Sequence, residues 1–273
     1  IGALVVGGSD FAGGYAARRT SPFRVTVWVQ AASLAGLIVG GFFVAAPAVR
    51  TTDIVAGLVG GAAATFSFAA LYRAFSEGQI SLLAPTAAIS SGVLPVFVGL
   101  VRGESISIVN WVGVIVAFAA ITLVSQSKAK LGEPDHTEPR AFVLAAIAGA
   151  GFALFFLALA ETSDNAGLWP LIISRLVSVP IVVVIAIALT GNVSVPTSVR
   201  PALYVAGVAE ALANVCALYA FQRGPLAVAA VISALFPVST VLLARLVLDE
   251  RLRREQWIGV GLALLAVPLV AVP

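Results

Sequence analysis

Three ionisable side chains lie inside long apolar stretches of this sequence. They are Asp10, Arg175 and Glu210. A charge at membrane depth costs at least about 2.5–3.5 kcal/mol, so a residue of this kind is a candidate for function. A guanidinium group binds a carboxylate strongly, and a carboxylate binds an ammonium group or carries a proton. These three residues therefore predict a site for a small charged or zwitterionic molecule.

Two interpretations of the charged residues are open at this stage. In the first, Arg175 pairs with Glu210 across adjacent helices and only holds them together, since a buried charge needs a partner. In the second, Arg175 binds a substrate carboxylate, while Asp10 or Glu210 takes an ammonium group or a proton. Asp10 has a further structural interpretation, as a residue near a membrane face or a cap of a neighbouring helix.

Uncharged polar residues and one aromatic residue extend this candidate set. Asn214 follows Glu210 by four residues, which places both on one side of a helix. Serines occur beside prolines in the fourth and ninth stretches, and a proline inside a helix kinks it. Kinked, hydroxyl-bearing helices suit a transporter cavity, although such hydroxyls also serve helix packing. The predicted substrate-binding set is Asp10, Trp28, Gln30, Ser90, Arg175, Glu210, Asn214 and Ser233.

The composition identifies the solvent that surrounds these residues. The chain has 273 residues, of which 60% are hydrophobic and only 11% are charged. Soluble domains are about 25% charged, so this chain could not cover a water-exposed surface. The net charge of +3 comes from basic residues scattered singly or in pairs. That scatter argues against a nucleic-acid partner and predicts a protein embedded in a lipid bilayer.

Ten apolar stretches are long enough to cross or nearly cross a membrane, for which about 20 residues are needed. Their residues do not alternate in polarity as barrel strands do, and lipid offers no partner for an open sheet edge. We therefore predict an all-α polytopic membrane protein with ten transmembrane helices. The predicted spans are residues 1–17, 24–46, 53–73, 80–101, 106–125, 140–160, 167–190, 200–222, 226–247 and 255–272.

The ten predicted spans divide into two sets of five. Shifting the sequence by 146 residues places Glu104 on Glu250, Trp111 on Trp257 and Gly113 on Gly259. An odd number of helices per set makes the second set enter the membrane in the opposite orientation. Such inverted repeats are typical of transporters. We predict one five-helix repeat in residues 1–125, a polar linker in 126–139 and a second repeat in 140–273.

Several short motifs accompany the repeat. A Gly-Ser-Asp-Phe run ends at Phe11, and a Leu-x-x-x-Glu motif precedes a Trp-x-Gly helix in each half, at Leu100–Glu104 and Leu246–Glu250. With ten spans as five plus five, the chain resembles the drug/metabolite transporter superfamily, and within it the EamA-type ten-helix transporters. The resemblance covers the whole chain. It implies secondary transport of a small polar metabolite, often export of an amino acid or a related compound.

The sequence and the resemblance together predict a secondary transporter, most simply an exporter of a small amphipathic or zwitterionic metabolite by alternating access. A transporter of a cationic or quaternary ammonium compound is the alternative, with the acids and Trp28 forming the site. The expected partners are the substrate, the lipid bilayer and a coupling proton. We expect a monomer or homodimer in the plasma (inner) membrane of a bacterium.

Enzymatic activity is not expected from these residues. The sequence holds no HExxH pair and no phosphate-binding GxxxxGK[ST] loop, and the single cysteine, Cys216, excludes a CxxC metal site. We therefore expect no catalytic residues, no metal and no cofactor.

Two criteria give opposite membrane orientations. The loops after the odd-numbered spans hold most of the basic residues, whereas the other loops hold Arg50, Arg102 and Arg223. The positive-inside rule then places both termini outside the cytoplasm, while the resemblance implies that both lie inside it. We further predict that Glu104 and Glu250 cap the helices that follow them, and that Gly57-x-x-x-Gly61 permits close helix packing.

Overall fold

The structure, a computed structural model, describes residues 1–17, 19–77, 80–126, 138–248 and 253–272. Within these ranges every regular element is a helix, as predicted from the composition. Two short 3-10 helices accompany the α-helices, η1 (Asp164–Ala166) and η2 (Thr197–Val199). The α-helices are α1 (Gly2–Ala17), α2 (Pro22–Gly41), α3 (Thr51–Ser76), α4 (Ile80–Val101), α5 (Ile108–Ser125), α6 (Pro139–Ala160), α7 (Trp169–Thr190), α8 (Arg200–Arg223), α9 (Leu226–Ala234), α10 (Phe236–Leu248) and α11 (Arg254–Ala271).

Each predicted apolar stretch corresponds to a helix, with one difference. The ninth stretch is broken into α9 and α10 at Leu235, two residues before Pro237. Proline has no backbone N–H, so Pro237 cannot donate a helical hydrogen bond to the carbonyl of Ser233. The predicted kink is therefore a complete interruption of the helix. Most of the predicted linker, residues 127–137, lies outside the described residues.

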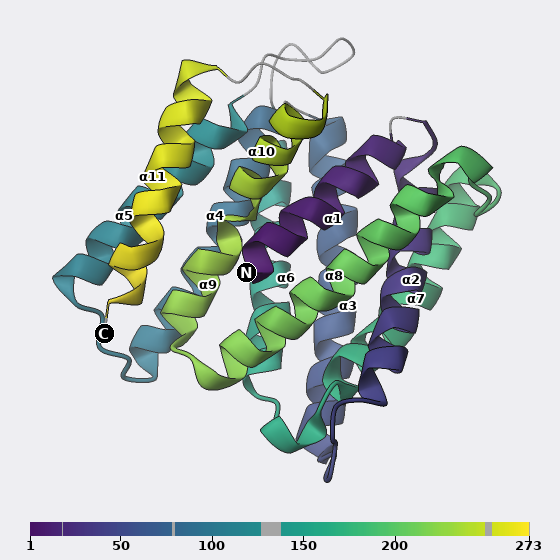
Figure 1. Ribbon diagram of the computed structural model, residues 1–273, viewed down its shortest axis with the longest axis horizontal. Coiled ribbons are helices and arrows are strands. Elements are labelled where there is room, and N and C mark those ends of the chain that lie inside the picture. Colours follow the sequence, from purple (N-terminus) through teal and green to yellow (C-terminus); the bar gives the residue numbers. More distant parts are fainter. Residues whose placement is uncertain (18, 78–79, 127–137, 249–252, 273) are drawn as a thin grey trace.

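Nine segments of the described chain are long and apolar enough to cross a membrane. The exception among the predicted spans is α1, which has 16 residues and is shorter than the roughly 20 residues of a full span. Figure 1 shows that α1 begins near the middle of the molecule and runs to one side of it. The chain is a multi-pass membrane protein.

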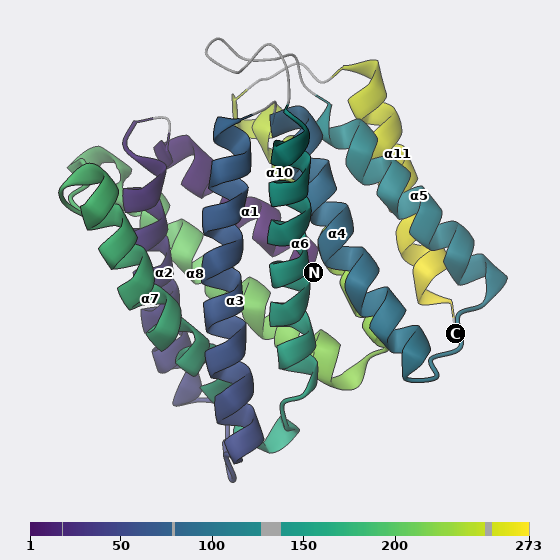
Figure 2. The ribbon, with the colours of Figure 1, turned by 180° about the vertical axis from the view of Figure 1, so that it is seen from behind.

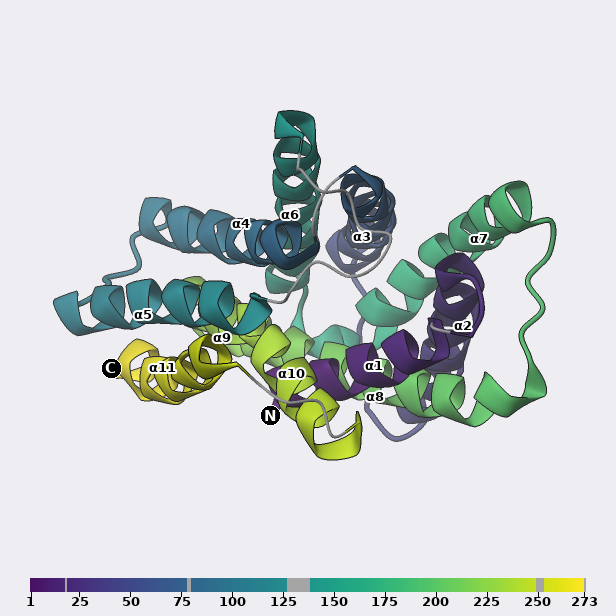
Figure 3. The same ribbon diagram turned by 90° about the horizontal axis from the view of Figure 1, so that it is seen from above.

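The helices form an elongated bundle in which the two halves of the chain interleave. Seen from above in Figure 3, α5 and α11 pair at one end, and α2 and α7 pair at the other. Between these pairs, α1 packs against α8 and α10 on one side of the bundle, while α6 packs against α3 and α4 on the opposite side. The view from behind in Figure 2 shows α3, α6 and α4 side by side.

Contacts between the halves occur in reciprocal pairs. The α1–α8 contact has a counterpart in α3–α6, and the α1–α10 contact has one in α4–α6. The same reciprocity appears in single residues of the α5–α11 pair. A Cβ atom on Gly113 would lie 2.7 Å from the backbone nitrogen of Val270, and one on Gly259 would lie 2.8 Å from that of Val124. Each glycine therefore brings its own backbone into direct contact with that of the other helix. The two glycines are 146 residues apart in the sequence.

The structure corrects the predicted role of Glu104. Its carboxylate accepts hydrogen bonds from the backbone N–H groups of Leu226 (2.7 Å) and Ala227 (3.2 Å), so it caps α9 in the other half of the chain. The following helix, α5, is capped instead by Ser107. Sequence proximity gave the wrong helix because the tertiary fold brings the start of α9 to the end of α4. Glu250 lies outside the described residues.

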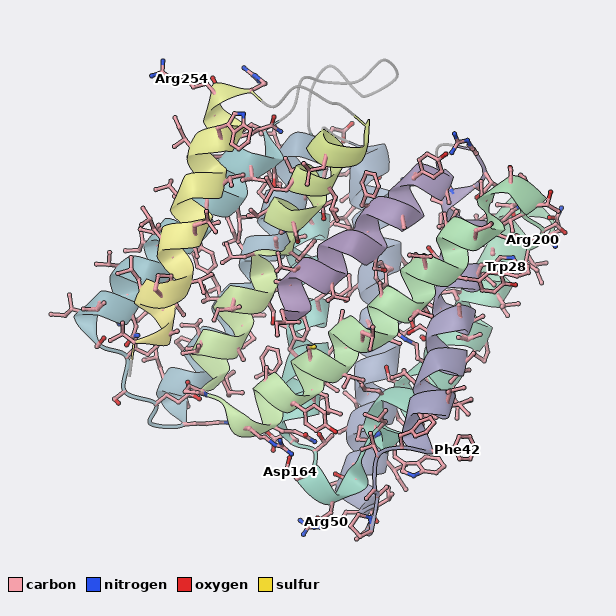
Figure 4. The ribbon with its side chains drawn as sticks, viewed as in Figure 1. Trp28, Phe42, Arg50, Asp164, Arg200 and Arg254 are labelled. Carbon is pink, nitrogen blue, oxygen red and sulfur yellow. The ribbon has the colours of Figure 1, made fainter. Side chains whose placement is uncertain are left out.

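The described arginines at the helix ends are distributed unequally between the two sides of the bundle. The turns after α2, α4, α6 and α8 lie on one side, which we name the Asp164 side. The other ends lie on the Arg254 side; Figure 4 labels both residues. The described arginines at the helix ends of the Asp164 side are Arg50, Arg102 and Arg223, and those of the Arg254 side are Arg19, Arg24, Arg73, Arg140, Arg200, Arg253 and Arg254.

The predicted close packing at Gly61 gives a stability test. A Cβ atom there would lie 2.5 Å from the carbonyl oxygen of Ser174 in α7. Gly61→Ala should therefore cost about 1–3 kcal/mol of stability, which is roughly 2–10 °C in thermal midpoint. Gly261→Ala is the matched control, because a Cβ atom on Gly261 meets nothing within 4 Å. Thermal unfolding in detergent checks this, and equal midpoints for the two variants would contradict the packing argument.

Candidate functional site

The structure brings Arg175 and Glu210 together in the interior of the bundle. Arg175 lies on α7 and Glu210 on α8, and a guanidinium nitrogen (Nη2) of Arg175 is 2.9 Å from Oε1 of Glu210. The side chains are only 5% and 18% exposed, respectively. The ion pair expected from the sequence therefore forms, and both charges are largely removed from solvent.

Helix α2 supplies a third contact to this pair. The Nε of Arg175 donates a hydrogen bond to Oγ of Ser33, at 3.4 Å, and Ser33 is fully buried. Because Oγ and Oε1 bind different nitrogens of one guanidinium group, its plane is fixed from two directions. Arg175 is therefore positioned by α2 and α8 as well as by its own helix.

Glycines bring the backbones close at this level of the bundle. A Cβ atom on Gly207 in α8 would lie 2.6 Å from the carbonyl oxygen of Val29 and 3.0 Å from the nitrogen of Ser33, both in α2. Gly61 of α3 packs in the same way on Ser174, the residue before Arg175. Small residues at helix interfaces permit such approach in membranes. They keep α2, α3, α7 and α8 within reach of one another around the ion pair.

One oxygen of Glu210 is left without a partner. Its Oε2 is buried and makes no hydrogen bond among the described residues. A buried acceptor without a donor costs about 1–3 kcal/mol, and more when charged. The site is therefore incomplete as it stands, because Oε2 can accept a further N–H or O–H group.

Asp10 lies close enough to Glu210 for the two carboxylates to interact electrostatically. Its neighbour Ser9 explains this position, since Oγ of Ser9 donates to the carbonyl oxygen of Ala206 at 2.9 Å and holds α1 on α8. Asp10 itself is exposed. Asp10 and Glu210 thus lie in one region, and Glu210 there is paired with Arg175.

Asn214 and Gln30 lie on the same helices as the residues of the pair. Asn214 is half-buried, one turn after Glu210, and its Nδ2 donates to the carbonyl oxygen of Glu210 at 2.9 Å. Gln30 is 2% exposed and its Oε1 has no hydrogen bond. On α2 it lies one turn from Val27, which packs on α7, and one turn from Ser33.

The other three predicted residues lie apart from the ion pair. Trp28 donates from its indole nitrogen to the carbonyl oxygen of Val193 at 2.8 Å, and the guanidinium of Arg200 lies over its ring (Figure 4). Ser90 of α4 packs on α6, where a Cβ atom on Gly149 would lie 2.5 Å from that of Ser90. Ser233 lies near the end of α9, beside the helix break.

Two residues that sequence reasoning missed flank Arg175 on α7. Ser174 and Ser178 are 2% and 0% exposed, and the hydroxyl oxygen of neither has a hydrogen-bond partner among the described residues. The sequence did contain a signal for them, because two serines four residues apart lie beside an intramembrane arginine. Together with Gln30 and Glu210 they give this region four buried oxygens that lack a donor or acceptor.

The arrangement suits binding of an organic ion. Arg175 presents a guanidinium group to carboxylates, and Glu210 and Asp10 present carboxylates to ammonium groups or protons. Among the described residues, no group of three or more His, Cys, Asp or Glu residues could hold a metal ion.

Comparison with known proteins agrees with this architecture. No curated protein matches the chain, but 28 chains of solved structures do. One crystal structure superposes with a TM-score of 0.78 at 16% identity, over 99% of this chain and 94% of the other, and therefore shows the same fold. Residues 139–272 match the model of the EamA-like transporter family, part of the drug/metabolite transporter superfamily, and this second half of the chain is therefore of that family.

Proposed function

We propose that this protein is a secondary transporter that exports a small zwitterionic metabolite, such as an amino acid, by alternating access. The observation that carries the proposal is the buried Arg175–Glu210 pair, in which Oε2 of Glu210 has no hydrogen-bond partner among the residues that the structure describes. The family is one of transporters, and the charges of this pair support a zwitterionic substrate. The outward direction and the bacterial plasma membrane rest on the resemblance to the EamA-type group.

The proposed binding step is an exchange of partners. A substrate carboxylate replaces Oε1 of Glu210 at the Arg175 guanidinium, and the substrate ammonium pairs with the released Glu210. Each charge that leaves the original pair then acquires a new partner, so no charge is left bare in the interior. Ser33 continues to hold Nε of Arg175 during the exchange. A zwitterion satisfies both groups at once, whereas a simple anion or cation satisfies only one.

Alternating access is supported by the packing of the two halves. Their contacts are reciprocal, and the same 146-residue shift relates Gly113 to Gly259 and Val124 to Val270 at the α5–α11 contact. Two halves related in this way form two arrangements of similar energy, in which opposite sides are open. The break between α9 and α10 adds a discontinuous helix of the kind that transporters use near their binding sites.

The alternative function is transport of a cationic or quaternary ammonium compound. The nearness of Asp10 to Glu210 favours it, because two carboxylates together attract a cation. In that case Arg175 serves only to hold Glu210. Trp28 does not add to this alternative as the chain is folded here, since its ring faces Arg200 and its N–H is bonded to Val193.

Replacement of both residues of the pair tests the zwitterion site. Arg175→Leu alone would leave Glu210 buried without its partner, which is itself destabilising, so the test uses Arg175→Leu combined with Glu210→Gln. In proteoliposomes with a metabolite panel, zwitterion transport should fall about 10- to 100-fold, the equivalent of about 1.5–3 kcal/mol for hydrogen bonds to a charged group. Arg254→Gln, at an exposed helix start, is the control. Retained zwitterion transport in the double variant would refute the proposed site.

Coupling to protons is tested separately at the two acids. Asp10→Asn and Glu210→Gln each remove a group that can carry a proton while preserving its shape. We expect at least one of them to abolish the stimulation of transport by an imposed proton gradient. Asp10→Asn leaves the Arg175–Glu210 pair intact and should therefore retain exchange of substrate across the membrane. Fluorescent pH indicators inside the liposomes measure the accompanying proton flux. If both variants respond to the gradient as the unaltered protein does, neither acid carries the coupling proton.

A further inference from the structure

The turn between α6 and α7, residues 161–168, is bonded to several other segments on the Asp164 side. Its centre is Ser163, which is bound by Asp53 near the start of α3. Asp53 is fully buried, and its carboxylate accepts from the backbone N–H of Ser163 at 2.7 Å and from the hydroxyl of Ser163 at 3.0 Å. It also accepts from the backbone N–H of Arg50 at 2.7 Å. A charged acceptor with three donors forms strong hydrogen bonds.

Further contacts join this turn to the first half of the chain. Glu161 forms an ion pair with Arg102, at the end of α4, and the carbonyl oxygen of Asn165 accepts from the backbone N–H of Ala48 at 3.3 Å. Asp53, Arg102 and Ala48 all belong to the first half, whereas the turn belongs to the second. These bonds therefore cross the boundary between the halves.

Other bonds of the same turn stay within the second half. Gln222, at the end of α8, donates to Oγ1 of Thr162 at 2.8 Å and to the carbonyl oxygen of Ser163 at 3.2 Å. Arg223 pairs with Asp164 at 3.2 Å, and both side chains are exposed. The turn is thus bonded to the end of α8. The crossing bonds, together with the packing of α3 and α4 on α6 and of α3 on α7, hold it to the first half.

The opposite side of the molecule lacks this chemistry at the corresponding positions. The 146-residue shift relates Asp53 to Val199 and Thr162 to Ala16. Both counterparts lie in an apolar cluster with Val25, Val195 and Leu203. At these positions, therefore, the Asp164 side has a buried carboxylate and the Arg254 side has apolar packing. Elsewhere on the Arg254 side the halves are joined by the Arg140–Glu77 ion pair and by hydrogen bonds from Arg24 to Thr190 and Ser194.

We propose that the α6–α7 turn is a gate of the Asp164 side, and that Asp53 is the residue that latches it. Separation of the halves on this side removes both Ser163 bonds from Asp53 at once, and water must then hydrate the carboxylate. Opening is therefore unfavourable until water can enter, which makes it an all-or-none event. This inference rests on the proposed alternating access, but it depends on neither the substrate nor the Arg175 site.

Thiol accessibility tests the latch without any substrate. The reporter is Asn214→Cys in a Cys216→Ser background, because Asn214 is half-buried on α8 between Glu210 and the Asp164 side. Adding Asp53→Asn should raise its rate of modification by a membrane-impermeant thiol reagent roughly tenfold or more, the factor expected for losing one hydrogen bond to a charged group. Arg102→Gln should raise the rate in the same direction.

The matched control is Arg223→Gln, which breaks an ion pair of the same turn within one half. It should leave the modification rate unchanged. A rate that stays constant in Asp53→Asn, or that rises equally in Arg223→Gln, overturns the latch. Size-exclusion chromatography shows whether Asp53→Asn is misfolded. If it is, Ser163→Ala, which removes only one donor to Asp53, replaces it, and its thiol modification rate is judged in the same way. Absence of zwitterion transport would refute the proposed substrate and leave this result intact.

A disulfide provides the opposite test. In the Cys216→Ser background, Asp53→Cys with Ser163→Cys places two thiols where a carboxylate and a hydroxyl are in hydrogen-bond contact. Oxidation should stop transport of whichever panel solute the unaltered protein moves, and reduction should restore it. Full transport with the disulfide formed shows that the turn does not move, and overturns the gate.

Discussion

Lipid cannot hydrate a charge, and the arrangement of this protein's interior follows from that constraint. Arg175 is buried in a bundle whose surface is largely apolar, so its guanidinium must be paired inside the protein. Glu210 and Ser33 provide the partners from two other helices. Those helices can reach it only because Gly207 and Gly61 let backbones touch at the same level. The ion pair and the glycines therefore form one structural unit, and neither serves its purpose without the other.

The proposed site and the proposed gate are connected through two helices. Helix α7 carries Arg175 and begins at the α6–α7 turn, while α8 carries Glu210 and ends at Gln222 and Arg223, which are bonded to that turn. Helix α3 contacts both places, with Asp53 at its start and Gly61 in its middle. A change in the distance between Arg175 and Glu210 on substrate exchange would therefore be transmitted to the turn through continuous helices.

The match of residues 139–272 to the EamA-like transporter family indicates a transporter, and the shared fold with a solved structure at 16% identity adds the architecture alone. The choice of substrate has to come from residues of this chain. Under the proposed site, an intramembrane arginine next to two acids predicts different behaviour for a zwitterion and a cation, because each class of substrate leaves different charges unpaired. Ser90 packs on α6 and Ser233 lies near the end of α9, and neither residue distinguishes between these two classes of substrate.

The sequence by itself determined the helices and the three intramembrane charges, because both depend on composition within a single stretch. The ten apolar runs correspond to the observed helices, and Pro237 marked the place where the ninth one breaks. Only the tertiary structure decided which residues meet. It placed Glu104 on α9 rather than on α5, and it tied Trp28 to Val193 and Arg200 rather than to the ion pair. It also joined Asp53 to Ser163, 110 residues away. Such contacts depend on how helices from the two halves interleave, and no periodicity along one helix carries that information.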